Sequence, residues 1–262
     1  MEEKISQAIK LYLEGLTIAK ASKSAGIGSC TLQKQLKIKN LTRSNKINSR
    51  RFIINENYFE KIDTEEKAYW LGFIYADGYL SFSKNRKYIG IALSTIDELH
   101  LNKFLIATNS TYQIKQYENK SKWSTKKSKY SRVLISCDKM FDDLKNHGVL
   151  LHKSLILEFP TWLNKKFQKH FIRGYFDGDG SFAKATRGFT IKICGTKEFL
   201  HSINKIIKEN PALSKRKKDT KNNFYITIGG MKKVKKIANY MYGNCCVSLD
   251  RKHERFNLIM NF

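Results

Sequence analysis

The sequence is poor in proline, cysteine and acidic residues. Two prolines in 262 residues exclude Pro-rich linkers and collagen-like repeats. The five cysteines are odd in number and form no Cys-x-x-Cys pair, so neither a disulfide framework nor a zinc knuckle is indicated. No apolar run approaches the roughly 18 residues that a membrane span needs, and the opening MEEKISQAIK is not a secretory signal. We therefore expect a soluble protein of a reducing compartment, the cytoplasm or an organellar matrix, without a membrane partner.

What the sequence has in excess is positive charge. Lys and Arg number 49 against 23 Asp and Glu, a formal net charge of +26. Such an excess points to a polyanionic partner. The chain is 41% hydrophobic and 12% aromatic, so it is not a disordered basic tail.

Residues 1–40 have the pattern of a small helical unit. Ile5, Ile9, Tyr12 and Leu13 recur at helical spacing, and Gly15 ends that segment. Gly26 supplies the turn before a further helix over about 29–37. The segment resembles a helix-turn-helix of the resolvase and transposase kind, with that further helix as the recognition helix. Its outward residues would then contact DNA: Thr31, Gln33, Lys34 and Lys37. An ordinary helical hairpin with solubilising lysines is the alternative.

Residues 41–57 lose this periodicity and are rich in Asn, Ser, Lys and Arg, which indicates a basic linker able to follow a phosphate backbone.

The remaining chain contains a duplicated α/β unit. Residues 69–80 are matched by 171–182, at an offset of 102 residues (179 − 77). After each copy the patterns predict a hairpin, a helix, two further strands and a closing helix. The predicted ranges are 79–94, 96–108, 112–117, 132–137 and 139–147 for the first copy, and 181–194, 196–209, 215–219, 224–228 and 231–242 for the second.

Small residues stand four apart in each repeated segment. Gly72 and Ala76 in the first copy and Gly174 and Gly178 in the second would each lie on one helix face. Such faces let two backbones approach closely, and the simplest partner is the other copy, related by a pseudo-two-fold axis. This packing would bring Asp77 and Asp179 together at the two helix ends.

Two acids at two helix C-termini should repel one another unless a cation lies between them. Carboxylates and end-of-helix carbonyls are hard oxygen ligands suited to Mg²⁺, and metal-dependent nucleases use such sites. A single Asp-Gly is usually only a turn signal. Its repetition at one offset in a strongly basic chain favours the metal site.

The two segments WLGFIYADG (70–78) and IRGYFDGDG (172–180) resemble the paired motifs of LAGLIDADG homing endonucleases. The resemblance covers about 58–262 and implies an α+β fold. In that fold tandem αββαββα repeats, here 58–160 and 161–262, form two curved antiparallel sheets over DNA. The small all-α helix-turn-helix would precede them.

The resemblance also implies the site. Asp77 and Asp179 would bind divalent metal, Mg²⁺ with Mn²⁺ as a substitute, assisted by the backbone carbonyls of Ala76 and Gly178. A basic residue near the end of each repeat would support the developing charge, and Lys153 and Lys252 fit that place. The first copy departs from the pattern with Tyr75 where the second has Asp177; this position faces the protein body in the family.

DNA contacts follow from the same resemblance. Strand residues would face the major groove, and the hairpin tips would grip phosphates. The strand residues are Tyr79, Ser81, Ser83, Ser181 and Lys192, and the tip residues are Lys84, Arg86, Lys87, Lys184 and Arg187. The alternative for each tip is a solvated turn.

The resulting prediction is a monomeric enzyme that cuts both strands of a long double-stranded DNA target, leaves 3′ cohesive ends and promotes mobility of its host intron or gene. A non-cleaving relative, either a transcription regulator or an RNA-binding intron maturase, is the alternative. An intein-embedded nuclease is disfavoured because the chain leaves no room for splicing blocks.

Overall fold

The structure is a computed structural model that describes residues 1–262 apart from 40, 42–51, 84–85, 121–126, 152–154 and 216–220. The chain divides into two compact units, Met1–Arg51 and Phe52–Phe262. Among the described residues, no helix combines the length and the apolar character required to cross a bilayer.

In its described residues, 1–39 and 41, the first unit consists of three short helices. They are α1 (Glu2–Leu13), α2 (Ile18–Ser24) and α3 (Ser29–Ile38). Ala8, Tyr12, Ala21 and Leu32 are among the residues of its small core, whereas Leu13 is exposed. The turn at Gly26 has a φ of +63°, as the sequence predicts.

The second unit opens with α4 (Glu65–Ala76), β1 (Gly78–Ser83), β2 (Arg86–Ser94), the 3₁₀ turn η1 (Thr95–Asp97), α5 (Glu98–Ala107), β3 (Lys115–Lys120), β4 (Lys127–Ile135) and α6 (Asp138–Asn146). The same order then recurs as α7 (Lys165–Asp179), β5 (Gly180–Ala185), β6 (Gly188–Gly195), α8 (Lys197–Ile207), β7 (Leu213–Lys215), β8 (Phe224–Ile228) and α9 (Met231–Tyr242), followed by α10 (Asp250–Asn261).

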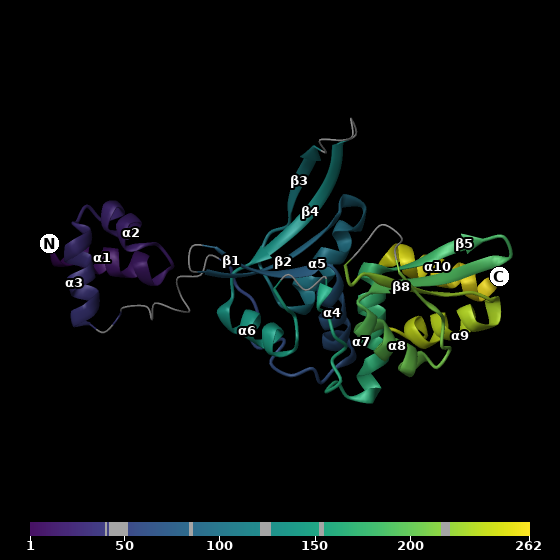
Figure 1. The fold of residues 1–262 in the computed structure, drawn as a ribbon. Helices are drawn as coiled ribbons and strands as arrows, with labels where there is room; N and C mark the ends of the chain where they lie inside the picture. The colour runs from purple at the N-terminus through teal and green to yellow at the C-terminus, as the bar shows by residue number, and fades with distance from the viewer. Residues whose placement is uncertain (40, 42–51, 84–85, 121–126, 152–154, 216–220) are drawn as a thin grey trace. The chain divides into compact units, whose positions relative to one another are not determined.

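Each repeat forms a four-stranded antiparallel sheet, ordered β1-β2-β4-β3 in the first and β5-β6-β8-β7 in the second (Figure 1). The predicted α+β fold of tandem repeats is therefore confirmed. Alternation along the strands buries one face of each sheet against helices: Ile89 and Ile91 of β2 are fully buried, as are Ile191 and Ile193 of β6.

Some predicted boundaries are wrong. The strand expected from residue 112 begins at Lys115. The Tyr112 N–H donates to the Ser110 side chain rather than to a neighbouring strand. The expected linker is too long at its C-terminal end, since Ile54 is buried and the Asn55 N–H donates to the Thr108 carbonyl. Most of the strand expected at 215–219 falls outside the described residues.

Helix α10 was not predicted from the sequence. Its two buried residues are Lys252 and Ile259, so it lacks the apolar stripe by which an amphipathic helix is recognised. A lysine occupies the inward position that a pattern search expects to be apolar.

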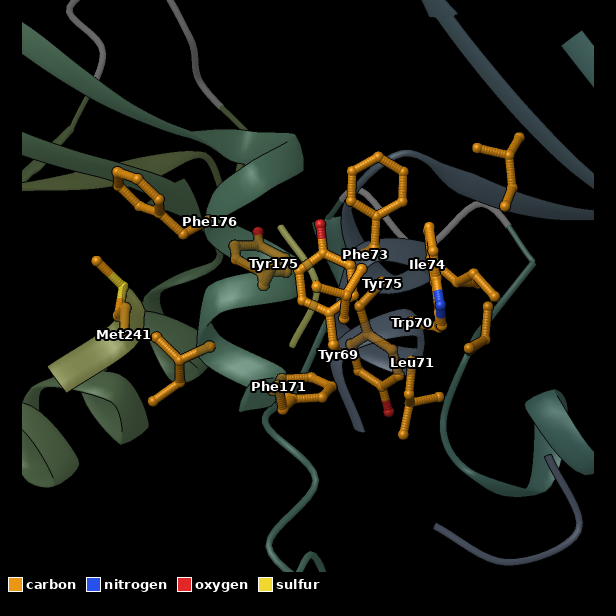
Figure 2. Close-up of a cluster of buried hydrophobic side chains, with 14 of the residues drawn as sticks. Tyr69, Trp70, Leu71, Phe73, Ile74, Tyr75, Phe171, Tyr175, Phe176 and Met241 are labelled. Carbon is orange, nitrogen blue, oxygen red and sulfur yellow. The ribbon is translucent and has the colours of Figure 1, made fainter. Parts of the chain in front are cut away.

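Helices α4 and α7 form the centre of the core. Both are buried on nearly every side in their C-terminal halves, and their aromatic residues, among them Tyr69, Phe73, Tyr75, Phe171 and Tyr175, gather between the two sheets (Figure 2). Helix α4 is apolar all round and therefore lacks the one-sided pattern of a surface helix, whereas α7 also buries the polar side chains of His170, Arg173 and Asp177.

One polar residue in this core predicts an acid sensitivity. The His100 side chain is 1% exposed, and its Nε2 lies 2.8 Å from the Tyr69 hydroxyl. Burial lowers the pKa of His100 to about 3, so the folded protein holds it neutral, whereas the unfolded chain protonates it near its ordinary pKa of about 6.5. The stability that depends on neutral His100 is therefore lost as the pH falls from about 6.5 towards about 3.

We expect His100→Phe to flatten this dependence, since the ring can occupy the aromatic environment of Trp70 and Phe73 without titrating. Urea unfolding near pH 7 and near pH 4 measures how the free energy of unfolding of each protein depends on pH. Between pH 7 and pH 4 the free energy of unfolding of the parent should fall by roughly 3 kcal/mol more than that of the variant. Equal losses would show that His100 does not titrate on unfolding in this range.

Candidate active site

The two motif helices touch through their small residues. A Cβ added at Gly72 would lie 2.0 Å from the carbonyl oxygen of Phe171, and one added at Gly174 would lie 2.0 Å from that of Tyr69. These distances are far below van der Waals contact, so only glycine fits at either position. The structure thus places Gly72 and Gly174 at the α4–α7 interface, reciprocally against the partner helix.

The same packing brings the ends of the motifs together. A Cβ at Gly178 would lie 2.3 Å from the Cβ of Ala76 and 3.2 Å from the Asp77 carboxyl carbon. Asp77 is the C-terminal cap of α4, and Asp179 is the last residue of α7. Asp77 and Asp179, about a hundred residues apart in the sequence, are thereby brought together at the ends of two helices.

The Tyr175 hydroxyl is influenced electrostatically by both Asp77 and Asp179. Its pKa is raised well above the ordinary value, first by burial and then by the negative charges of Asp179 and Asp77. The hydroxyl also donates to the Cys194 carbonyl at 2.9 Å. A cavity of about 470 Å³ adjoins this group, and Ala76, Gly178 and Asp179 contribute to its wall. Both carboxylates therefore act on one buried point beside an accessible cavity.

The donor set suits a hard divalent cation. Two carboxylates, with the carbonyls of Ala76 and Gly178 at the helix ends, are oxygen ligands of the kind that Mg²⁺ and Mn²⁺ prefer. Within the described residues there is no group of three or more His, Cys, Asp or Glu side chains arranged for a metal. The predicted set differs in composition, since it has two acids and relies on backbone oxygens.

Lys252 is buried against the backbone on both sides of Asp179. It is 4% exposed, and its Nζ donates to the carbonyls of Phe176, Asp177 and Gly180 at 2.5, 2.6 and 2.8 Å. Burial lowers its pKa to about 8, although the carboxylates of Asp177, Asp77 and Asp179 act in the opposite direction. The ammonium neutralises the negative end of α7 and fixes the backbone on both sides of Asp179. Lys153, its predicted counterpart, lies outside the described residues.

Asp177 anchors the segment that carries Lys252. It is fully buried and accepts hydrogen bonds from the hydroxyls of Tyr69 and Tyr242 and from the Leu249 N–H. Burial raises its pKa, opposed chiefly by the charge of Lys252. In the first repeat Tyr75 stands at this position, and its hydroxyl donates to the His147 carbonyl after α6. Both residues thus face the protein body and tie a motif helix to the segment that follows the third α-helix of its repeat.

The predicted DNA-contacting residues fall into three groups. Those that alternate with the buried residues of the sheets lie on what we call the open faces, the sides away from the helices: Tyr79, Ser81, Ser83 and Arg86 in the first sheet, Ser181 and Lys192 in the second. The second group is exposed and consists of Lys184 on β5, Arg187 in the turn that follows, and Thr31, Gln33 and Lys34 on α3. Lys87 lies on the helix side and pairs with Asp142 of α6 at 2.5 Å, and Lys84 falls outside the described residues.

Arg132 is a residue that the sequence reasoning missed. It lies on the open face of the first sheet, where its guanidinium carbon is 4.4 Å from the centre of the Tyr117 ring. The second sheet has a related pair, with the Lys192 Nζ 4.0 Å from the Tyr225 ring centre. Arg132 begins a predicted strand in which Val133 and Ile135 are buried, so alternation alone places it on the outer face.

Comparison with known proteins agrees with this architecture. A sequence model of the LAGLIDADG-like domain matches residues 166–242, which include most of α7 and extend to the end of α9. The DNA-directed RNA polymerase subunit Rpo1C of Methanocaldococcus jannaschii is 29% identical over 162 residues, 62% of this chain. The chain spans only 18% of that relative's length.

Among solved structures, the meganuclease I-SmaMI bound to uncleavable DNA with a TTGT central four is similar over 74% of this chain and 87% of its own, with 11% identity and a TM-score of 0.51. A double mutant of I-SmaMI is similar over 74% and 89%, with 11% identity and a TM-score of 0.52. The LAGLIDADG resemblance is thereby confirmed as a domain match within the second repeat and as a shared fold. The helix-turn-helix assignment of residues 1–40 stays a prediction.

Proposed function

We propose that this protein is a site-specific, metal-dependent endonuclease acting on double-stranded DNA. The observation that carries the proposal is the meeting of the two motif ends, where Gly178 packs against Ala76 and Asp77 and both acids act on Tyr175. Two carboxylates and the carbonyls of two helix C-termini, brought together at one place, favour a divalent cation in addition to the Lys252 ammonium. The site also lies beside two open sheet faces in a chain of net charge +26.

Asp77 and Asp179 would hold Mg²⁺, or Mn²⁺ in its place, with the carbonyls of Ala76 and Gly178. A divalent ion at such a site activates water and stabilises the leaving oxygen in phosphodiester hydrolysis. The chain itself supplies the rest of the site. Gly72 and Gly174 set the helix separation, Lys252 fixes the backbone around Asp179, and Lys153 would be its counterpart in the first repeat.

The open faces would read the major groove, and the exposed basic residues would contact phosphates. Because the pseudo-two-fold relation lies within one chain, a monomer would cover both half-sites, and its target would be asymmetric. Cutting both strands to leave 3′ cohesive ends would promote mobility of the host intron or gene.

The direct test incubates the full-length protein and Mg²⁺ with the host gene's allele that lacks the insertion. We expect one double-strand break whose mapped ends carry 3′ overhangs, and no product when the metal is chelated. Specific binding without any cut would instead favour a non-cleaving regulator.

A further prediction concerns the first unit. If Thr31, Gln33 and Lys34 of α3 contact DNA, removing residues 1–40 should weaken binding and shorten the protected footprint at one flank, while cutting of saturated DNA persists. DNase footprinting of both proteins measures this, and binding by each should fall steeply with salt. An unchanged footprint would mean that α1–α3 make no DNA contact.

A further inference from the structure

The first sheet carries a stacked column of planar side chains on its open face. The rings of Tyr117 and Tyr130 are stacked, with centroids 5.3 Å apart and an interplanar angle of 17°. The Arg132 guanidinium carbon lies 4.4 Å from the Tyr117 ring centre, and its Nη2 donates to the Tyr117 hydroxyl at 2.9 Å. These three residues, which we call the Arg132 column, come from neighbouring strands, since Tyr117 of β3 pairs with Tyr130 of β4.

The column holds the guanidinium in place before any ligand arrives. An arginine on a bare surface loses considerable rotamer entropy when it is immobilised, whereas a guanidinium seated on an aromatic ring has already lost it. Among the described residues, the Arg132 guanidinium donates one hydrogen bond, to the Tyr117 hydroxyl, so further N–H donors of its planar fork stay available. Arg132 is partly exposed, so these donors can reach a ligand.

Its position in the sheet places the column close to the candidate active site. Arg132 pairs with Ala92 of β2, and the adjacent residue Ile91 pairs with Gly78, which directly follows Asp77. An arginine fixed here faces the same DNA half-site as β1, near the point of cleavage.

We infer that Arg132 is a specificity-determining residue that reads a guanine by a bidentate contact to O6 and N7 in the first half-site. This inference rests on the proposed function. The planar fork held by Tyr117 matches the two acceptors of guanine, which no other base presents together on its major-groove edge. The related cation of the second sheet, Lys192 over Tyr225, is a point charge without this fork. The two half-sites are therefore read with different precision.

The test uses a randomised duplex DNA library selected by the full-length protein, Arg132→Lys, Arg132→Ala and Lys115→Ala. Lys115 of β3 is exposed and lies directly opposite Arg132 of β4. Lys115→Ala therefore removes a positive charge beside Arg132 and serves as the matched control. We expect the parent and Lys115→Ala to select a G·C pair at one position of the first half-site. Both Arg132 variants should lose that preference alone and bind the parent consensus about tenfold or more weakly.

Tyr117→Phe keeps the ring but removes the hydroxyl, so it should retain the guanine preference with weaker binding. Circular dichroism and thermal unfolding verify that the variants are folded, which is expected for residues outside the core.

An Arg132→Lys selection identical to the parent's, or equal weakening on all sequences, would overturn the inference in favour of a phosphate contact while leaving the proposed function intact. A parent that selects no sequence would overturn the proposed function and this inference together.

Discussion

Asp77→Asn and Asp179→Asn are each expected to reduce double-strand cleavage by at least about a hundredfold while the protein still folds and binds its target. Asn preserves the side-chain shape but removes the charge that holds a divalent cation, so the loss falls on chemistry rather than on binding. Binding should be unchanged or slightly tighter, because repulsion with phosphate is relieved. Residual nicking of one strand is the expected remaining activity.

The matched control is Asp63→Asn, which removes one carboxylate charge just before the other end of α4, where Asp63 pairs with Lys67 on the surface. It should cut like the parent. Single-turnover cleavage in Mg²⁺, with DNA binding measured in parallel, separates the two effects. If both active-site variants cut at the parental rate, the assignment of the paired acids is wrong.

Gly72→Ala and Gly174→Ala should be the most damaging small substitutions in the second unit. Each methyl group would lie 2.0 Å from a backbone carbonyl oxygen of the partner helix, and backbone cannot move aside as a flexible side chain can. Overpacking of cores typically costs 1–3 kcal/mol, and a forced separation of α4 and α7 should cost at least about 3 kcal/mol.

Gly229→Ala serves as the control, because the nearest atom to its added Cβ is a Thr190 methyl at 3.9 Å. Chemical denaturation should show it within about 0.5 kcal/mol of the parent. Parental stability for Gly174→Ala would contradict the helix contact on which the site depends.

Repetition made the centre of this molecule predictable from sequence. Gly72 and Gly174 recur at one offset, and the structure places both at the α4–α7 interface, with Asp77 and Asp179 at the adjoining ends. The hairpins that follow each motif were also predictable, since large aliphatic residues recur at every second position of their second strands, as at Ile89, Ile91 and Leu93 of β2 and at Ile191 and Ile193 of β6.

Features that depend on tertiary contacts were not predictable. Lys87 reads as a hairpin-tip cation, but Asp142, 55 residues later, holds it on the helix side. The resemblance predicts Lys252 as a basic residue that supports the developing charge, but the sequence does not reveal that its ammonium is buried among backbone carbonyls. The Arg132 column depends on strand register, which places Tyr117 opposite Tyr130.

The unlike residues at matching motif positions make the two repeats non-interchangeable. Asp177 takes one of its three donors from Tyr69 of the first repeat, and the residue matching Tyr69 in the second repeat is Phe171. A symmetric dimer built from two second repeats would therefore leave each buried carboxylate one donor short, in both halves at once. Chimeric proteins that join repeats from different parents must therefore exchange Tyr69 and Asp177 as a pair, or the hybrid interface between α4 and α7 will be the weakest part of the fold.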